Sequence, residues 1–226
     1  MISEVTNEDN MIMMARYPDK FFDLAIADPP YGIGGDKGVQ KNNGKWGYKQ
    51  HRHTDWDSSI PSKEYFMELF RVSKNQIIWG GNYFSEYLPS RMGWVAWDKA
   101  QTDFSFSDFE LAWTSFDCKC RKFELIRGFD FKGKHYSMND GRIHPTQKPQ
   151  ALYVWLLDNY SAAGEKILDT HLGSGASRIA AYKLGFDFWG CEIDKDYFEA
   201  QERRFKEAIN EPLFQTQPER IQAKLL

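Results

Sequence analysis

The sequence predicts an α/β fold with a mostly parallel sheet and helices on both faces, in a single domain that spans residues 1–226. Three observations predict it. Short apolar runs end at proline or glycine, amphipathic stretches of helical period lie between them, and the last third reads as strand, glycine turn, helix, strand. With 42% apolar residues the chain can bury a large core, which excludes disorder as its global state.

The first half alternates between expected strands and an expected helix. Residues 22–27 form an apolar run that stops at two prolines, which lack the backbone donor of a sheet, so a buried strand is expected. Residues 61–73 carry apolar side chains at mostly helical spacing behind a proline in the first turn. Further strands are expected at residues 77–79, 93–97 and 109–113. The polar, glycine-rich stretch 32–57 reads as a long loop, and residues 115–143 show only weak periodicity.

The last third gives clearer patterns. A helix is expected over residues 150–163, ended by Gly164, and a strand over residues 166–169. A glycine turn at 171–175 leads into a helix over 176–184 that Gly185 stops. A strand over 186–193 follows and carries Glu192 near its end. This order is a βαβ unit of the nucleotide-binding kind.

Composition and charge exclude several classes of protein. No apolar run reaches the ~18 residues of a membrane span, and the acidic amino terminus is unlike a signal peptide. Three cysteines make no disulfide framework and fit a reducing cytosol, so a cytoplasmic protein is expected. Cys118 and Cys120 have no second pair, and no metal ligand set is expected. A net charge of −3 excludes nucleic-acid binding by overall charge but not by a local patch.

The glycine turn is the first motif that carries chemistry. Gly173 and Gly175 allow close backbone approach to a ligand at a helix amino terminus. Glu192 follows the next strand, about where a carboxylate accepts the ribose hydroxyls of a nucleoside. Arg178 occupies the third glycine position of the full dinucleotide motif, so an ordinary strand-to-helix turn is the alternative.

The sequence Asp28-Pro29-Pro30-Tyr31 is more specific. A carboxylate at the tip of a parallel strand faces the crevice in which α/β proteins bind ligands. Asp28 and a proline carbonyl would each accept one hydrogen from an exocyclic amino group, while the Tyr31 ring stacks on the planar base. The alternative is a strand-ending turn with an exposed aspartate.

A third motif, His-Pro-Thr-Gln-Lys-Pro, occupies residues 144–149. Thr146 and Lys148 offer a hydroxyl and a cation, which suit the carboxylate of a cofactor. A proline-bounded loop with a solvated lysine is the alternative.

In their order, these motifs resemble the DNA amino-methyltransferases of the permuted β group, over residues 7 to 205. The resemblance implies a Rossmann-like methyltransferase fold with circularly permuted motif order. It also implies transfer of a methyl group from S-adenosylmethionine to the 6-amino group of adenine or the 4-amino group of cytosine. By the same resemblance, aspartate in place of serine before Pro-Pro-Tyr favours adenine over cytosine as the target base. An RNA or protein amino-methyltransferase is less favoured because of the permuted order, and a non-catalytic binding module because of the intact Asp-Pro-Pro-Tyr.

The resemblance carries over to two groups of residues. The catalytic group is Asp28, Pro29, Pro30 and Tyr31. The cofactor-binding group is Asp9, Thr146, Lys148, Asp169, His171, Leu172, Gly173, Ser174, Gly175, Glu192 and Ile193, with Asp9 expected at the cofactor's adenine. Thr170 and His171 stand where the family usually has Pro-Phe, so the way in which this side of the site contacts the cofactor is left open.

Double-stranded DNA is the expected partner, and the target base must be flipped out to reach such a pocket. DNA contacts are expected from the basic residues of the 32–57 loop, which are Lys37, Lys41, Lys45, Lys49 and Arg52. The segment 115–143 is the candidate for target recognition. A solvated loop and a peripheral hairpin are the respective alternatives. A homodimer and a cognate restriction endonuclease are left open.

Overall fold

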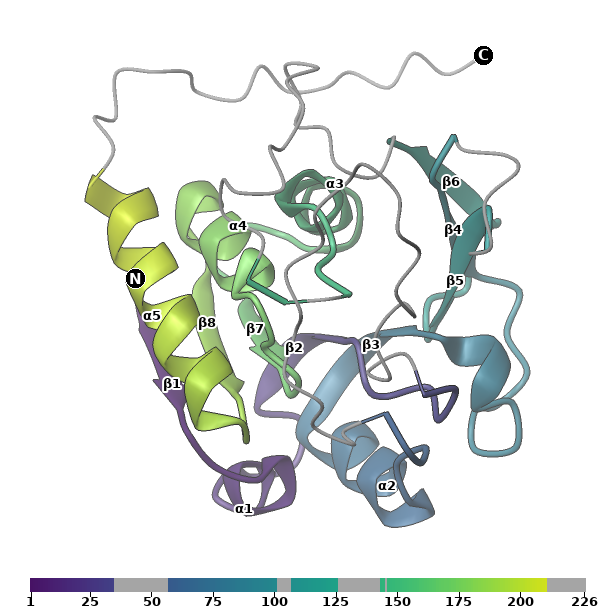
Figure 1. Cartoon of the computed structure of the whole chain (residues 1–226). Coiled ribbons are helices and arrows are strands. Elements are labelled where there is room, and N and C mark those ends of the chain that lie inside the picture. The colour runs from purple at the N-terminus through teal and green to yellow at the C-terminus, as the bar shows by residue number, and fades with distance from the viewer. Residues whose placement is uncertain (35–56, 101–106, 126–142, 145, 211–226) are drawn as a thin grey trace, which may run out of the picture.

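A computed structural model describes residues 1–34, 57–100, 107–125, 143–144 and 146–210. Its centre is an eight-stranded sheet in the order β1-β8-β7-β2-β3-β5-β4-β6 (Figure 1). The strands are β1 (Ser3–Thr6), β2 (Phe22–Ala27), β3 (Ser73–Trp79), β4 (Trp94–Asp98), β5 (Phe109–Thr114), β6 (Arg121–Glu124), β7 (Lys166–Asp169) and β8 (Asp187–Cys191). The helices are α1 (Asn10–Met14), α2 (Lys63–Val72), α3 (Gln150–Tyr160), α4 (Ala176–Leu184) and α5 (Lys195–Asn210), with a short 3-10 turn, η1 (Gly81–Tyr83).

Strand direction confirms the mostly parallel sheet. From β1 through β8, β7 and β2 to β3, each strand pairs with its neighbour in parallel. β5 is antiparallel to both β3 and β4, and β6 is parallel to β4. β5 is therefore the one reversed strand among those described. Its amino-terminal end lies at the edge of the sheet where β2 and β3 end.

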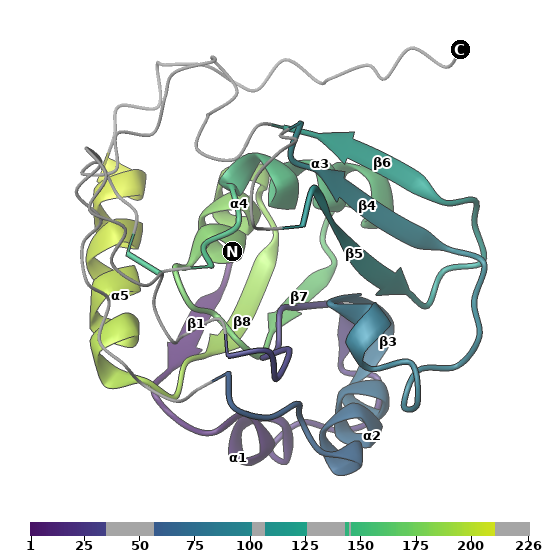
Figure 2. The ribbon, with the colours of Figure 1, turned by 45° about the vertical axis from the view of Figure 1, so that its right-hand side comes forward.

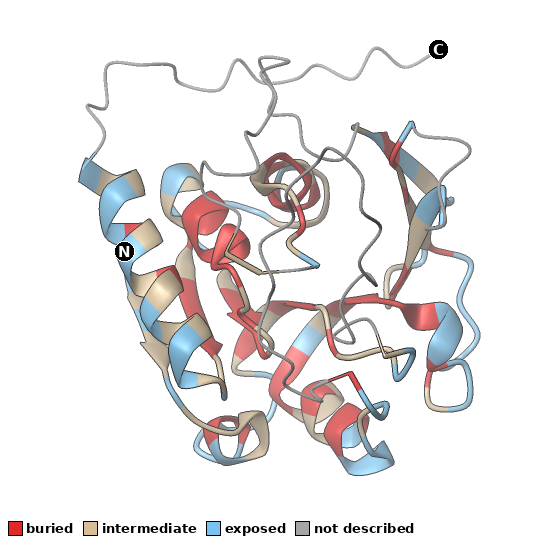
Figure 3. Ribbon diagram, viewed as in Figure 1, coloured by how far each residue is buried: buried red, intermediate tan, exposed pale blue. Residues whose placement is uncertain are grey.

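Helices cover both faces of the sheet, as expected (Figure 2). Along β2, Leu24 and Ile26 pack into one core with α3 and α4, whereas Ala25 and Ala27 pack into a second core with α1 and α2. Alternate side chains of a strand point to opposite faces, so a strand buried on both sides must be apolar throughout. Buried residues accordingly run along the central strands in Figure 3.

The βαβ unit of the last third is confirmed as β7, α4 and β8, and several boundaries differ from expectation. The expected 150–163 helix ends at Tyr160 because Ser161 is extended, and its hydroxyl donates to the Leu157 carbonyl at 2.6 Å. The expected 61–73 helix begins at Lys63, and Ser73 already belongs to β3. The strand expected over 186–193 is confined to β8.

Asp57 ties together the two described flanks of the long segment between β2 and α2. Its carboxylate accepts the Gly32 N–H at 2.8 Å, and its carbonyl accepts the Gly34 N–H at 3.0 Å. Only 3% of Asp57 is exposed. Asp57 therefore holds the start of the chain that leads into α2 against the residues that follow β2.

Candidate active site

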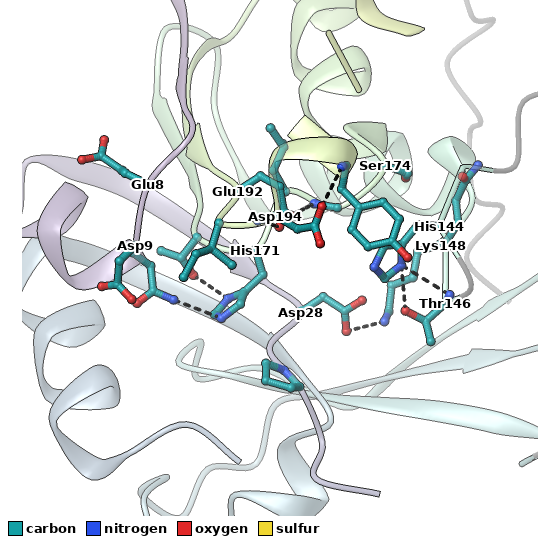
Figure 4. Close-up of a pocket in the computed structure, with 18 of the residues that line it drawn as sticks. Glu8, Asp9, Asp28, His144, Thr146, Lys148, His171, Ser174, Glu192 and Asp194 are labelled. Carbon is teal, nitrogen blue, oxygen red and sulfur yellow. Dashed lines mark hydrogen bonds and ion pairs between the residues drawn. The ribbon is translucent and has the colours of Figure 1, made fainter. Parts of the chain in front are cut away.

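A pocket lies at the carboxyl ends of β2, β7 and β8 (Figure 4). β2 and β7 are adjacent and parallel, but the chain continues from β2 through α2 and from β7 through α4, on opposite faces of the sheet. Ligands of open α/β sheets bind in the crevice at such a switch point. The predicted residues that line the pocket are Asp9, Asp28, Pro30, Thr146, Lys148, His171, Leu172, Gly173, Ser174, Glu192 and Ile193.

Four predicted site residues lie outside the pocket lining: Pro29, Tyr31, Asp169 and Gly175. Asp169 holds the two ends of the glycine turn together. Its carboxylate accepts a hydrogen bond from the His171 N–H at 2.9 Å and one from the Ser177 hydroxyl at 2.6 Å. These two hydrogen bonds lower the pKa of the Asp169 carboxyl, but burial outweighs them and raises the pKa to about 7. Gly175 has a φ of 70°, and a Cβ there would come within 3.1 Å of Gln201. Both residues shape the turn from outside the pocket.

Asp28 directly follows β2 and is held by two donors. The Lys148 ammonium lies 2.5 Å from Oδ1, and the Tyr31 hydroxyl donates to the same oxygen at 2.8 Å. Burial raises the pKa of the Asp28 carboxyl, and the positive charge of Lys148 opposes that shift. These two contacts hold a half-buried carboxylate in the lining of the pocket.

The Tyr31 ring packs against the segment that follows β3. It stacks on Tyr83, with ring centroids 5.1 Å apart and planes 16° apart, and it covers Gly80. Gly80 has a φ of 72°, which favours glycine. One face of the ring is therefore occupied by Tyr83, and stacking on a substrate base stays a prediction.

Lys148 and Thr146 both line the pocket. Lys148 is 4% exposed, and its ammonium group contacts the carboxylates of Asp28 and Glu110, the latter at 3.2 Å. That cation pairs with two protein carboxylates and also lines the pocket, and its contact with a cofactor stays a prediction. The Thr146 hydroxyl lies 3.1 Å from Nδ1 of His144 and still lines the pocket.

Glu110 completes a row of four alternating charges. Its carboxylate forms one ion pair with Lys148 and a second, at 2.9 Å, with Lys99. Lys99 is only 5% exposed. Burial alone would raise the pKa of Glu110, but the two lysine charges outweigh it and lower the value to about 2. Burial likewise lowers the pKa of Lys148, and Asp28 and Glu110 raise it above its ordinary value. Sequence reasoning noted the 109–113 strand but missed Glu110, since only the reversed direction of β5 brings it here.

Glu192 links the end of β8 to the glycine turn. Its Oε2 accepts the Gly173 N–H at 2.8 Å and its Oε1 accepts the Asp194 N–H at 2.9 Å. Burial raises its pKa, and the backbone donors oppose the shift. Gly173 has a φ of 51°, and a Cβ placed on it would meet no protein atom closer than His144 at 3.8 Å. The space above this glycine is therefore open to a ligand.

His171, the departure from the family pattern, is held by polar neighbours. Its Nε2 lies 3.1 Å from the Asn10 side-chain amide, and its Nδ1 lies 3.0 Å from the Thr170 hydroxyl. Burial lowers the pKa of His171 to about 3, so the ring is neutral near pH 7. The imidazole thus supplies a flat, uncharged wall with its polar atoms satisfied.

Asp9 lines the pocket while also capping α1, because its carboxylate accepts the Met11 N–H at 2.8 Å. Sequence reasoning did not assign the remaining lining residues, which are Glu8, Asn10, His144, Gln147, Tyr153, Thr170, Asp194 and Tyr197. His144 belongs to a motif that was singled out, whereas Tyr197 lies on α5 and has no local signal. The His144 and Tyr197 rings pack edge to face, 4.5 Å apart, at one side of the pocket.

The residues predicted to contact DNA in the 32–57 loop lie outside the described residues, as does most of the 115–143 segment. Its described part contains β6, an edge strand next to β4. Within the described ranges, no cluster of three or more His, Cys, Asp or Glu side chains could hold a metal ion. No described helix is both long and apolar enough to cross a membrane.

Known proteins match nearly the whole chain. The family described as DNA methylase, with the label N6_N4_Mtase, matches residues 78–203. Type II methyltransferase M.HpaI of Haemophilus parainfluenzae is 27% identical, covering 83% of this chain and 69% of its own length. Type II methyltransferase M2.DpnII of Streptococcus pneumoniae is 25% identical, covering 92% of this chain and 90% of its own length.

Solved structures share the fold. M1.HpyAVI in complex with SAM matches with a TM-score of 0.58 and 17% identity, covering 93% of this chain and 100% of its own. The PvuII DNA methyltransferase, which is cytosine-N4-specific, matches with a TM-score of 0.57 and 10% identity, covering 91% of this chain and 90% of its own. These matches confirm the Rossmann-like architecture that the motifs predict.

Proposed function

The chain belongs to the DNA methylase family, and from this premise we propose that it transfers a methyl group from S-adenosylmethionine to the 6-amino group of an adenine flipped out of DNA. One observation carries the proposal. A single pocket is lined at one end by the glycine turn and at the other by Asp28, so a cofactor and a target amino group would meet inside it.

The residues of the glycine turn fit the cofactor. The open space above Gly173 accommodates a ligand against the backbone, and the Glu192 carboxylate, which lines the pocket, would accept the ribose hydroxyls. Asp9 and His171 would border the cofactor's adenine. The bound cofactor supplies an electrophilic methyl group on a sulfonium.

The chemistry of the chain's own residues is positional and electrostatic. The amino nitrogen of adenine is a weak nucleophile because its lone pair is delocalised into the ring. Asp28 and the Pro29 carbonyl would accept its two hydrogens and favour a more tetrahedral nitrogen, whose lone pair then points at the methyl group. No covalent enzyme intermediate is needed. The base has to be extruded from the duplex to reach Asp28.

Adenine is proposed over cytosine because the residue before Pro-Pro-Tyr is aspartate. The fold does not discriminate between the two bases, since the cytosine-N4-specific PvuII enzyme shares it. N4-cytosine methylation is therefore the second candidate. RNA and protein amino groups are less favoured substrates.

The DNA would lie over the pocket, so that the extruded base reaches Asp28. The five basic residues of the 35–56 segment are proposed to contact phosphates, and the 115–143 segment is proposed to recognise the target sequence.

The test is transfer of a labelled methyl group from S-adenosylmethionine to unmethylated DNA, followed by digestion and identification of the labelled nucleoside. N6-methyladenine is expected with the wild type and not with Asp28→Ala. Asp19→Asn is the matched control, because Asp19 precedes β2, at the opposite end of that strand from the pocket, and its side chain is 77% exposed. N4-methylcytosine would overturn the proposed base, and no label in DNA would overturn the proposed substrate.

A further inference from the structure

Lys148, whose motif predicts a cation suited to the carboxylate of a cofactor, pairs with Asp28 in this structure. We propose that Lys148, held by Glu110, is a positioning residue for Asp28. It binds one carboxylate oxygen and so leaves the other turned toward the target amino group. This inference rests on the proposed function, because it assigns Asp28 to the reacting nitrogen.

The contacts of Asp28 are one-sided. Lys148 at 2.5 Å and the Tyr31 hydroxyl at 2.8 Å both contact Oδ1. Figure 4 shows the second oxygen turned toward the space between the labelled side chains. Lys148 also donates to the Tyr31 hydroxyl at 3.1 Å, so the three groups form a closed triangle. A carboxylate fixed in this way cannot rotate without breaking two charge-assisted hydrogen bonds.

Glu110 fixes the other side of Lys148. Its Oε2 lies 3.2 Å from the Lys148 ammonium, and its Oε1 lies 2.9 Å from the buried Lys99. Glu110 belongs to β5, where it pairs with Trp97 of β4, so its backbone is fixed in the sheet. Pro149, next to Lys148, is the amino-terminal cap of α3 and restricts the chain there. Both anchors of Lys148 are therefore rigid.

The charges balance along the row Lys99, Glu110, Lys148, Asp28. If one of the four side chains is replaced by an uncharged one, the charge of its neighbour in the row is no longer balanced in this poorly solvated place, which is unfavourable. Without Lys148, Asp28 would face the negative Glu110 alone, and its carboxyl would bind a proton more readily. The titratable groups that face Asp28 from the surrounding elements are Tyr31, Tyr65 of α2, Glu110 of β5, Lys148, Tyr153 of α3 and Asp169 of β7.

The test compares Lys148→Met, Lys148→Arg and Glu110→Gln in single-turnover methylation at saturating cofactor and DNA, across a pH series, with cofactor affinity measured by calorimetry. Lys74→Met is the matched control: this lysine also pairs with a carboxylate, that of Asp23, but its side chain is 55% exposed and it lies near the amino-terminal end of β3, away from the pocket.

We expect Lys148→Met to lower the saturated rate about 10–100-fold, with cofactor affinity nearly unchanged. The acidic limb of its pH profile should move to higher pH because the positive neighbour of Asp28 is gone. Lys148→Arg should recover part of the rate. Glu110→Gln, nearly the same shape, should show a smaller loss, and it keeps the proposal testable if Lys148→Met does not fold.

A cofactor affinity that falls while the saturated rate and its pH profile stay at the wild-type values would overturn the inference and make Lys148 a cofactor ligand. An unchanged rate in Glu110→Gln, with Lys148→Met also active, would overturn it too. A wild type that binds cofactor but does not methylate DNA would instead overturn the proposed function, so the two failures are distinguishable.

Discussion

Alanine at Gly80 would place a methyl group against the Tyr31 ring. The ring cannot retreat freely, because Tyr83 stacks on it at 5.1 Å and its hydroxyl is bonded to Asp28 at 2.8 Å. The backbone at Gly80, with φ of 72°, adds strain for any residue with a Cβ. Left-handed backbone costs about 1–2 kcal/mol and overpacking about 1–3 kcal/mol, so Gly80→Ala should lower the free energy of unfolding by about 2–5 kcal/mol.

Gly164 provides the matched control. Its φ is 84°, but a Cβ there would meet no atom within 4 Å, so Gly164→Ala should show the backbone cost alone, about 1–2 kcal/mol. Urea unfolding followed by circular dichroism measures both variants. The double variant Gly80→Ala/Tyr31→Ala should cost less than the sum of its single variants, because the clash is removed. Equal losses for Gly80→Ala and Gly164→Ala would show that the Tyr31 ring is not confined, and the reasoning would be refuted.

Three further outcomes are expected. His171→Phe removes the contact with Asn10, so cofactor binding measured by calorimetry should persist, with affinity changed by no more than about tenfold. The Asp169 carboxyl has a raised pKa in the folded protein, so its contribution to stability should be complete below about pH 4 and disappear as the pH rises through about 7. Asp169→Asn should flatten that part of a urea-unfolding pH series. Arg178→Met breaks the ion pair with Glu202 and should lower the free energy of unfolding by about 3 kcal/mol in the same urea assay.

Local signals were sufficient for the parts of the fold that neighbouring residues determine. The glycine turn between β7 and α4 could be predicted because Gly173 and Gly175 adopt positive φ, which glycine favours. The meeting of Asp28 with that turn followed from a general rule, since parallel strands end at one edge of the sheet.

Contacts between distant elements could not be predicted in the same way. The ion pair of Lys148 with Glu110 requires that β5 run against β3, and no residue in either segment specifies that direction by itself. The stack of Tyr31 on Tyr83 depends on the path of the chain through Gly80. The three motifs that line the pocket could therefore be found from the sequence, whereas the partners of Lys148 and of the Tyr31 ring could not.

Asp57 has a consequence for how this chain can be altered. Its carboxylate and carbonyl hold Gly32 and Gly34 close to the chain that leads into α2. The free-energy cost of closing a chain between two joined points rises by only about 0.6 kcal/mol for each doubling of its length. A change in the length of the 35–56 segment should therefore cost little stability as long as Asp57 keeps these two hydrogen bonds.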